Sequence, residues 1–296
     1  MAPFFVQNFL SYLQSEKRYS ENTRIAYEVD IEQFLDFAAI NSEKDLLEIS
    51  SLLIRGWIVD LVEKEYSKRS VNRKLSTLRS FFKWLKREGV LLINPIQRVQ
   101  GPKTEKKLPS FVRTSDMSIE KIDEFFEKDS DGIRNRLIVE MFYQTGIRLN
   151  ELINLKNSNI EKDRIRVLGK REKERIIPIS SVLFLLIEEY KSQVGSRVND
   201  SDYLFVLKSG KKMYSKLVYR IINSYLGHMT NLDTCSPHVL RHTFATHMLN
   251  NGAGLETLKD LLGHANLSAT QVYTHNSFKQ ITNIYSQAHP RGHKKN

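Results

Sequence analysis

The chain has 296 residues, close to the upper limit for a single hydrophobic core, so we expect two domains. Lys and Arg number 45 against 34 Asp and Glu, a formal net charge of +11 that favours a polyanionic partner such as nucleic acid, with a membrane surface as the competing partner. The single cysteine, Cys235, excludes an internal disulfide and a multi-cysteine zinc site. No apolar run approaches the roughly 18 to 20 residues needed to cross a bilayer, and the first residues lack a basic segment. We therefore expect a cytoplasmic protein without membrane contact.

The first part of the chain, residues 3–92, has helical patterns that predict several helices in a small domain. The most informative segment is 68–87, where apolar residues recur at alternating steps of four and three: Val71, Leu75, Leu78, Phe82 and Leu85. This spacing predicts an amphipathic helix with one buried face.

Another face of segment 68–87 is basic, and the segment contains no acidic residue. A charged face is most often solvated surface, but the missing counter-charges favour a helix that follows DNA phosphates. The basic residues expected to contact DNA from this helix are Arg69, Arg73, Lys83 and Arg87.

The next stretch is rich in glycine, proline and lysine, which marks a linker. We place the linker at 101–109, between an N-terminal domain of residues 1–100 and a second domain of residues 110–296. It could be a simple tether, or its lysines could lie along a DNA backbone: Lys103, Lys106 and Lys107.

The second domain is predicted to be mainly helical with a small antiparallel sheet. Expected helices span 118–127, 132–144, 181–191 and 215–225, with a short strand at 203–207. Segments 164–168 and 175–179 alternate apolar and polar residues around Gly169, which predicts a β-hairpin. A last amphipathic helix, containing Phe278 to Tyr285, could pack on its own domain or dock into a neighbouring copy as an oligomerisation helix.

Residues 236–273 carry four side chains suited to moving a phosphoryl group without a metal: His238, Arg241, His264 and Tyr273. Ser236 and Pro237 form a helix-start signature, with the serine hydroxyl expected to cap free amides. His238 and Arg241 then share one face of the first turn, where a phosphate is favoured. His264 follows the helix end at Gly263, and Tyr273 lies one to two turns into the next helix.

Two further residues complete the candidate set. Arg148 follows the helix break at Gly146, and its planar fork suits the bidentate binding of phosphate. Lys170 lies at the tip of the predicted hairpin, where its ammonium could donate a proton to a leaving oxygen, with Lys173 as the nearest competitor. Each residue alone has an ordinary structural explanation, and only the combination favours function.

Four segments, in order, look like the catalytic boxes of the tyrosine recombinase (phage integrase) family, which the chain resembles over nearly its whole length. They are TGIRLNELINL at 145–155, LGKREKERIIPI at 168–179, HVLRHTFATHML at 238–249 and LGHANLSATQVYTH at 262–275. The ending, with Tyr285 followed by AHPRG at 288–292, is similar to the Xer group of chromosome-dimer resolvases.

The resemblance implies a role for each candidate. Tyr273 would attack a DNA phosphodiester to give a 3′-phosphotyrosyl link and a free 5′-hydroxyl, as in type IB topoisomerases, without metal, ATP or other cofactor. Arg148 and Arg241 would clamp the non-bridging oxygens, and His264 would donate a further hydrogen bond. Lys170 would protonate the departing 5′-oxygen, and His238 would assist proton transfer at Tyr273.

The resemblance also implies a fold and partners. An N-terminal helical, SAM-like core-binding domain and a catalytic domain would close as a C-shaped clamp on a double-stranded DNA recombination site. Four protomers, of this chain alone or with a second Xer-type recombinase, would exchange strands through a Holliday junction. The process implied is resolution of chromosome dimers at cell division, with a possible accessory cell-division protein.

Three alternatives remain open from the sequence. A metal-dependent nuclease could use His238 and His242, four residues apart, although no third ligand or HExxH pattern is evident. A site-specific DNA-binding protein could keep the scaffold without the chemistry, which the intact set of six residues argues against. A mobile-element integrase or excisionase would use the same chemistry, and the short stretch before Pro3 favours the resolvase.

Overall fold

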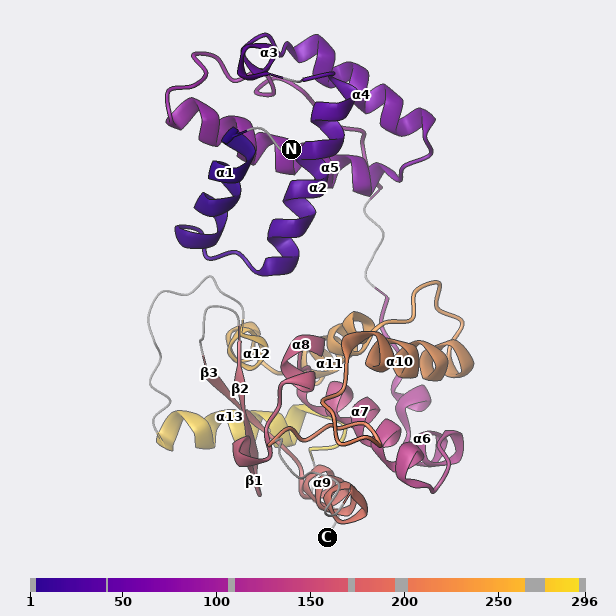
Figure 1. The fold of residues 1–296 in the computed structure, drawn as a ribbon. Coiled ribbons are helices and arrows are strands. Elements are labelled where there is room, and N and C mark those ends of the chain that lie inside the picture. The colour runs from indigo at the N-terminus through magenta and orange to yellow at the C-terminus, as the bar shows by residue number, and fades with distance from the viewer. Residues whose placement is uncertain are drawn as a thin grey trace. The chain divides into compact units, whose positions relative to one another are not determined.

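The computed structural model of the protein describes residues 4–40, 42–105, 110–169, 174–194, 202–263 and 275–292. The chain divides into two compact units, Met1–Lys107 and Leu108–Asn296 (Figure 1). Each unit has its own cluster of buried apolar side chains, and the two clusters share no residue. The fold class is mainly α with a small antiparallel sheet, as the sequence predicts.

All regular secondary structure among the described residues of the first unit is helical. Its helices are α1 (Phe4–Ser15), α2 (Glu21–Phe37), α3 (Glu43–Leu47), α4 (Ser51–Glu63) and α5 (Lys68–Arg87). Helix α5 packs against α1, α2 and α4, and all five residues of its predicted apolar stripe are buried. Aromatic rings fill the centre, with Phe34 edge-on to both Trp57 and Phe82. The strong periodicity of this segment therefore predicted its buried face correctly.

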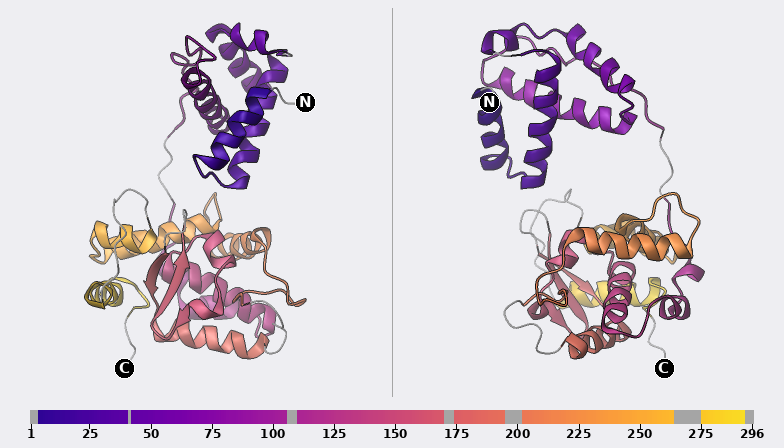
Figure 2. Two further views of the ribbon diagram at one scale, coloured as in Figure 1. Left: turned by 60° about the vertical axis from the view of Figure 1, so that its left-hand side comes forward. Right: turned by 45° about the vertical axis from the view of Figure 1, so that its right-hand side comes forward.

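The second unit places helices around a three-stranded sheet (Figure 2). Its elements, with two short 3-10 turns, are η1 (Thr114–Met117), α6 (Ile119–Phe125), α7 (Ser130–Thr145), α8 (Leu149–Ile153), η2 (Asn157–Asn159), β1 (Ile160–Glu161), β2 (Arg164–Leu168), β3 (Glu174–Pro178), α9 (Ser181–Val194), α10 (Ser215–Met229), α11 (Pro237–Asn250), α12 (Leu255–Leu262) and α13 (His275–Ala288). Helix α7 is buried along most of its length and packs against α9, α10 and α11.

The predicted hairpin is present as the antiparallel pair β2 and β3, with Ile165 opposite Ile177 and Val167 opposite Arg175. Gly146 ends α7, as predicted, in the left-handed conformation with φ of 58°. A Cβ at this position would lie 2.6 Å from a ring carbon of Phe244 on α11 and 2.9 Å from a methyl of Leu262 on α12. The glycine thus lets the ends of α7 and α12 approach α11 closely.

Two local predictions are wrong. Residues 203–207 do not form a strand, because Tyr203 and Val206 make only isolated bridges, to Lys156 and Lys212. Ser236 does stand at the N-cap of α11, with Pro237 following, but its hydroxyl makes no capping hydrogen bond.

Helix α13 packs on its own unit, against α11 and β3. Its apolar residues Phe278, Ile281 and Tyr285 are buried. Its end is also fixed by hydrogen bonds, since the Asn251 side-chain amide donates to the Ala288 carbonyl at 2.8 Å. Of the two interpretations that the sequence left open, the structure has own-domain packing, and docking into a neighbouring copy stays a prediction. Among the described residues, no helix is long and apolar enough to cross a membrane.

Candidate active site

The sequence predicts that Arg148 and Arg241 share a phosphate. In the structure, both side chains reach the backbone at the end of α12. Arg148 lies at the N-cap of α8, just after the turn at Gly146, and Arg241 lies on the second turn of α11. Arg241 donates from one terminal nitrogen to the Gly146 carbonyl at 2.5 Å and from the other to the Leu262 carbonyl at 2.7 Å. Arg148 donates to the next carbonyl, that of Gly263, at 3.0 Å.

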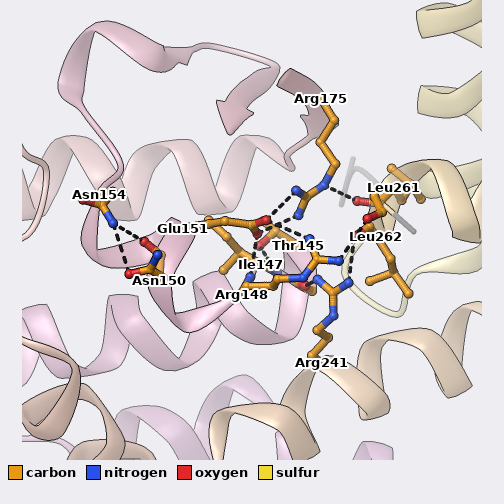
Figure 3. Close-up of polar contacts among 12 residues, drawn as sticks. Thr145, Ile147, Arg148, Asn150, Glu151, Asn154, Arg175, Arg241, Leu261 and Leu262 are labelled. Carbon is orange, nitrogen blue, oxygen red and sulfur yellow. Dashed lines mark hydrogen bonds and ion pairs between the residues drawn. The ribbon is translucent and has the colours of Figure 1, made fainter. Parts of the chain in front are cut away.

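A buried carboxylate, Glu151, orients Arg148 (Figure 3). One oxygen accepts the Arg148 backbone N–H and the other accepts its Nη1, both at 2.8 Å. Arg175 of β3 binds the same carboxylate with both terminal nitrogens, each at 2.8 Å. Glu151 therefore accepts four hydrogen bonds, which compensates a buried charge.

The C-terminal end of α12 is bound by all three arginines. Arg175 Nε donates to the Leu261 carbonyl at 2.8 Å, next to the contacts of Arg241 on Leu262 and Arg148 on Gly263. Three successive carbonyls at a helix end are left without helical partners and carry partial negative charge, so cations are stabilised there. This helix end directly precedes residue 264 in the chain.

The charged groups in this cluster shift one another's pKa values. Burial alone would raise the pKa of Glu151, but the hydrogen bonds and charge of Arg175, with those of Arg148, lower it to about 2. Burial lowers the pKa of Arg241 to about 9, helped by the charges of Arg148 and Arg175 and opposed by Glu151. Arginine remains charged at neutral pH even so. The cluster holds three guanidinium groups against one carboxylate, so an anion placed beside it would be stabilised.

The other candidates are described only in part. His238 is exposed on the first turn of α11. Lys170, His264 and Tyr273 lie outside the described residues, as does Lys173. Two described residues directly precede candidates in the sequence: Gly169 comes before Lys170, and Gly263 comes before His264.

Glu151 and Arg175 were not singled out in the sequence. The sequence signal for Arg175 was its alternation with Ile177, which places the two residues on the same face of β3. In the structure Arg175 is 4% exposed. An arginine at an inward position of a strand requires a buried partner. For Glu151 the signal was its place three residues after Arg148, where a carboxylate can reach back to a helix start.

The basic helix α5 has more counter-charge than its own sequence suggests. Arg73 binds Asp30 of α2 with both terminal nitrogens, at 2.5 and 2.8 Å, while Arg87 contacts Glu88 at 2.8 Å. Arg69, Lys83 and Lys103 are exposed, and none of them forms an ion pair within the part of the chain that the structure describes. Lys106 and Lys107 lie outside that part.

The metal hypothesis depends on further ligands beside His238 and His242. No group of three or more His, Cys, Asp or Glu side chains that could hold a metal ion occurs among the described residues. His242 lies 3.5 Å from the Thr246 hydroxyl, one turn along α11.

Structural comparison shows the same fold in proteins of low sequence identity. A XerH site-specific recombinase bound to a palindromic difH substrate has a TM-score of 0.72 and 19% identity, covering 95% of this chain and 83% of that one. A lambda integrase dimer bound to a core site has a TM-score of 0.67 and 17% identity, covering 91% of this chain and 98% of that one.

Sequence comparison is more specific. Tyrosine recombinase XerC of Thermodesulfovibrio yellowstonii is 37% identical, covering 97% of this chain and 96% of its own, and that of Bacillus subtilis is 35% identical, covering 99% and 98%. Residues 6–89 match the phage integrase N-terminal SAM-like domain, and residues 113–280 match the phage integrase family. The match over both units, together with the arginines gathered at the end of α12, means that this chain belongs to the phage integrase family.

Proposed function

We propose that this chain is a site-specific tyrosine recombinase of the XerC type, which cuts and rejoins double-stranded DNA through a 3′-phosphotyrosyl intermediate. The observation that carries the proposal is the convergence of Arg148 and Arg241 on consecutive carbonyls, 2.7 and 3.0 Å away, at the end of α12. That helix end leads into the segment with His264 and Tyr273. Relatives at 35 to 38% identity over nearly the whole chain, named tyrosine recombinase XerC, support the assignment.

In the proposed reaction, the Tyr273 oxygen forms a bond to the DNA phosphorus and the bond from phosphorus to the 5′-oxygen breaks. The phenol proton leaves with assistance from His238, and Lys170 delivers a proton to the departing 5′-oxygen. Arg148, Arg241 and His264 donate to the non-bridging oxygens, where negative charge accumulates. The covalent link conserves the bond energy, so rejoining requires neither ATP nor a metal.

The arginine geometry supports this chemistry because the donors are fixed before DNA arrives. Glu151 holds the backbone and side chain of Arg148, and two carbonyls hold Arg241. Preorganised donors stabilise the transition state without reorganisation at the moment of reaction. Among the described residues, the two guanidinium groups donate to backbone carbonyls and one carboxylate, and a phosphate can accept from their remaining N–H groups.

The partners follow from the same proposal. The protein acts on a double-stranded recombination site in a tetrameric synapse, of itself or with a second Xer-type recombinase, and both units close on the duplex as a C-shaped clamp. Helix α5 and residues 101–109 contribute phosphate contacts, and α13 docks on the neighbouring protomer in the assembled state. The biological role is resolution of chromosome dimers in the cytoplasm during cell division, with an accessory cell-division protein as a regulator.

A nicked suicide substrate tests the chemistry. The native chain should form a covalent protein–DNA adduct in EDTA, because no metal takes part. Tyr273→Phe should abolish the adduct and leave DNA affinity unchanged, because only the nucleophilic oxygen is removed. An adduct formed by Tyr273→Phe would refute the assignment of the nucleophile, and a native chain that binds its site without any adduct would indicate a non-catalytic binding protein.

The bound DNA site distinguishes the two recombinase roles. Pull-down sequencing of genomic DNA should recover a single locus near the replication terminus if the chain resolves chromosome dimers. Recovery of the boundary of a mobile element would instead identify an integrase or excisionase with the same chemistry.

A further inference from the structure

Arg175 is the third arginine of the site and has no role in the reaction proposed above. It lies on β3 opposite Val167 of β2, and its side chain is 5% exposed. It comes shortly after Lys170 in the sequence, and its side chain reaches from the sheet to α8 and α12.

All three side-chain nitrogens of Arg175 bind the protein itself. Nη1 and Nη2 each donate to one oxygen of Glu151 at 2.8 Å, and Nε donates to the Leu261 carbonyl at 2.8 Å. The bare Cα of Gly263 packs beside the same side chain, since a Cβ there would lie 3.0 Å from Arg175 Cδ. Arg175 is therefore enclosed, whereas 35% of the Arg148 side chain is exposed.

These contacts connect three elements that lie next to candidate catalytic residues in the sequence. Through Glu151, Arg175 determines where the Arg148 guanidinium is held. Through Leu261, it fixes the helix end from which the segment with His264 and Tyr273 departs. It does so from β3, the strand that follows Lys170 in the sequence.

We propose that Arg175 is a positioning residue for DNA cleavage, which sets the locations of Arg148 and of the α12 end by holding Glu151 and the Leu261 carbonyl. This inference rests on the proposed recombinase activity. A displacement of about 1 Å in such a donor can cost on the order of 100-fold in rate. Lysine at this position keeps the charge but cannot bind two carboxylate oxygens and a carbonyl in one plane.

The position of Arg175 also makes a prediction about pH. Without Arg175, burial still raises the pKa of Glu151 while its strongest opposing partner is gone, so the pKa of Glu151 rises. Neutral Glu151 no longer holds Arg148 as an ion pair. The ratio of native to variant cleavage rates should therefore grow as the pH falls.

The test compares full-length Arg175→Lys and Arg175→Gln with the native chain on the suicide substrate at saturating DNA. Arg166→Gln is the matched control, because Arg166 lies on the same hairpin and pairs with Glu161 at the surface. Thermal melting and DNA affinity are measured for each protein. We expect both Arg175 variants to fold and bind DNA, Arg175→Lys to cleave about 100-fold slower, and Arg166→Gln to match the native chain.

The outcomes separate this inference from the proposed function. Native cleavage rates in Arg175→Lys, or a native-to-Gln rate ratio that does not change with pH, would overturn it. Failure of both Arg175 variants to fold at 25 °C would also overturn it, because the role would then be structural. Absence of any adduct with the native chain would instead refute the recombinase chemistry itself.

Discussion

Arg241 is held by two carbonyls from different elements, Gly146 after α7 and Leu262 at the end of α12. A planar fork can bind both while presenting its remaining N–H groups, whereas an ammonium cannot span the same two positions. Residue-level geometry of this kind explains why an arginine is required where a positive charge alone would not be enough.

We therefore expect Arg241→Lys to lower the single-turnover cleavage rate by on the order of 100 to 1000-fold, the typical effect of losing one transition-state donor. DNA affinity should change little, because a charge remains. The rate constant of adduct formation on a suicide substrate measures the loss. A drop of less than about tenfold would mean that Arg241 acts through its charge alone.

Some residues of this cluster were identified from the sequence and others were missed. Arg148 and Arg241 were each identified from a position at a helix start, and the resemblance to the family implied that they act as a pair. Glu151 was missed because a glutamate in a helical segment usually lies at the surface. Arg175 was missed because its partner, Glu151, lies 24 residues earlier in the chain. Ion pairs between distant segments depend on tertiary structure, and the sequence pattern of one segment does not identify the partner on the other.

Helix α5 also has charge partners on another helix that its own sequence does not identify. Its apolar face was predicted from spacing alone, but the counter-charge for Arg73 on its basic face comes from α2. Asp30, which is fully buried, accepts from Arg73, from Lys74 at 2.9 Å and from the Thr77 hydroxyl at 2.9 Å. A buried carboxylate with this set of donors joins α2 to α5 in one orientation.

We expect Asp30→Asn to destabilise the first unit by about 3–5 kcal/mol, because Lys74 is left buried without a counter-charge. Urea denaturation, followed by the fluorescence of Trp57 and Trp84 in this unit, measures the change. Asp36→Asn, an exposed change on the same helix, is the control and should alter stability by less than about 0.5 kcal/mol. Equal effects of the two substitutions would contradict the role of Asp30.

The end of α13 is a second element whose fixation depends on a buried polar group. His289 is 1% exposed, donates from Nε2 to the Tyr143 carbonyl at 3.0 Å and accepts the Arg291 N–H on Nδ1 at 3.0 Å. The contact with Arg291 requires the neutral ring, because a protonated Nδ1 cannot accept a hydrogen bond. Burial lowers the pKa of His289 to about 3, opposed by the hydrogen bond to the Tyr143 carbonyl.

The sign of the resulting pH dependence follows from proton uptake. Between the unfolded pKa near 6.5 and about 3, the unfolded chain binds a proton at His289 that the folded chain does not, so stability decreases as the pH falls. We expect a loss of up to about 1.4 kcal/mol per pH unit in that window. Denaturation of native chain and of His289→Gln at several pH values checks this, and parallel curves for the two proteins would disprove it.

On the scale of the whole molecule, the two units have separate cores, with residues up to Val99 in one and from Val112 onward in the other. Since each core is closed, we expect fragments 1–107 and 108–296 each to unfold cooperatively on heating. Circular dichroism of the separate fragments tests this, and a fragment without a cooperative transition would show that its core is incomplete alone.

The division into units also predicts how the intact chain binds DNA, given the proposed activity. If both units contact one duplex, the second contact is intramolecular, and the intact chain should bind its site on the order of 100 to 10,000-fold more tightly than the stronger fragment. The slopes of log affinity against log salt for the two fragments should add up to that of the intact chain, because each phosphate contact releases counterions independently. Fluorescence anisotropy on one labelled DNA site across a salt series measures the affinity and the slope for the intact chain and for each of the two fragments. An intact chain with the affinity and slope of a single fragment would mean that only one unit contacts DNA, and the clamp would then be excluded.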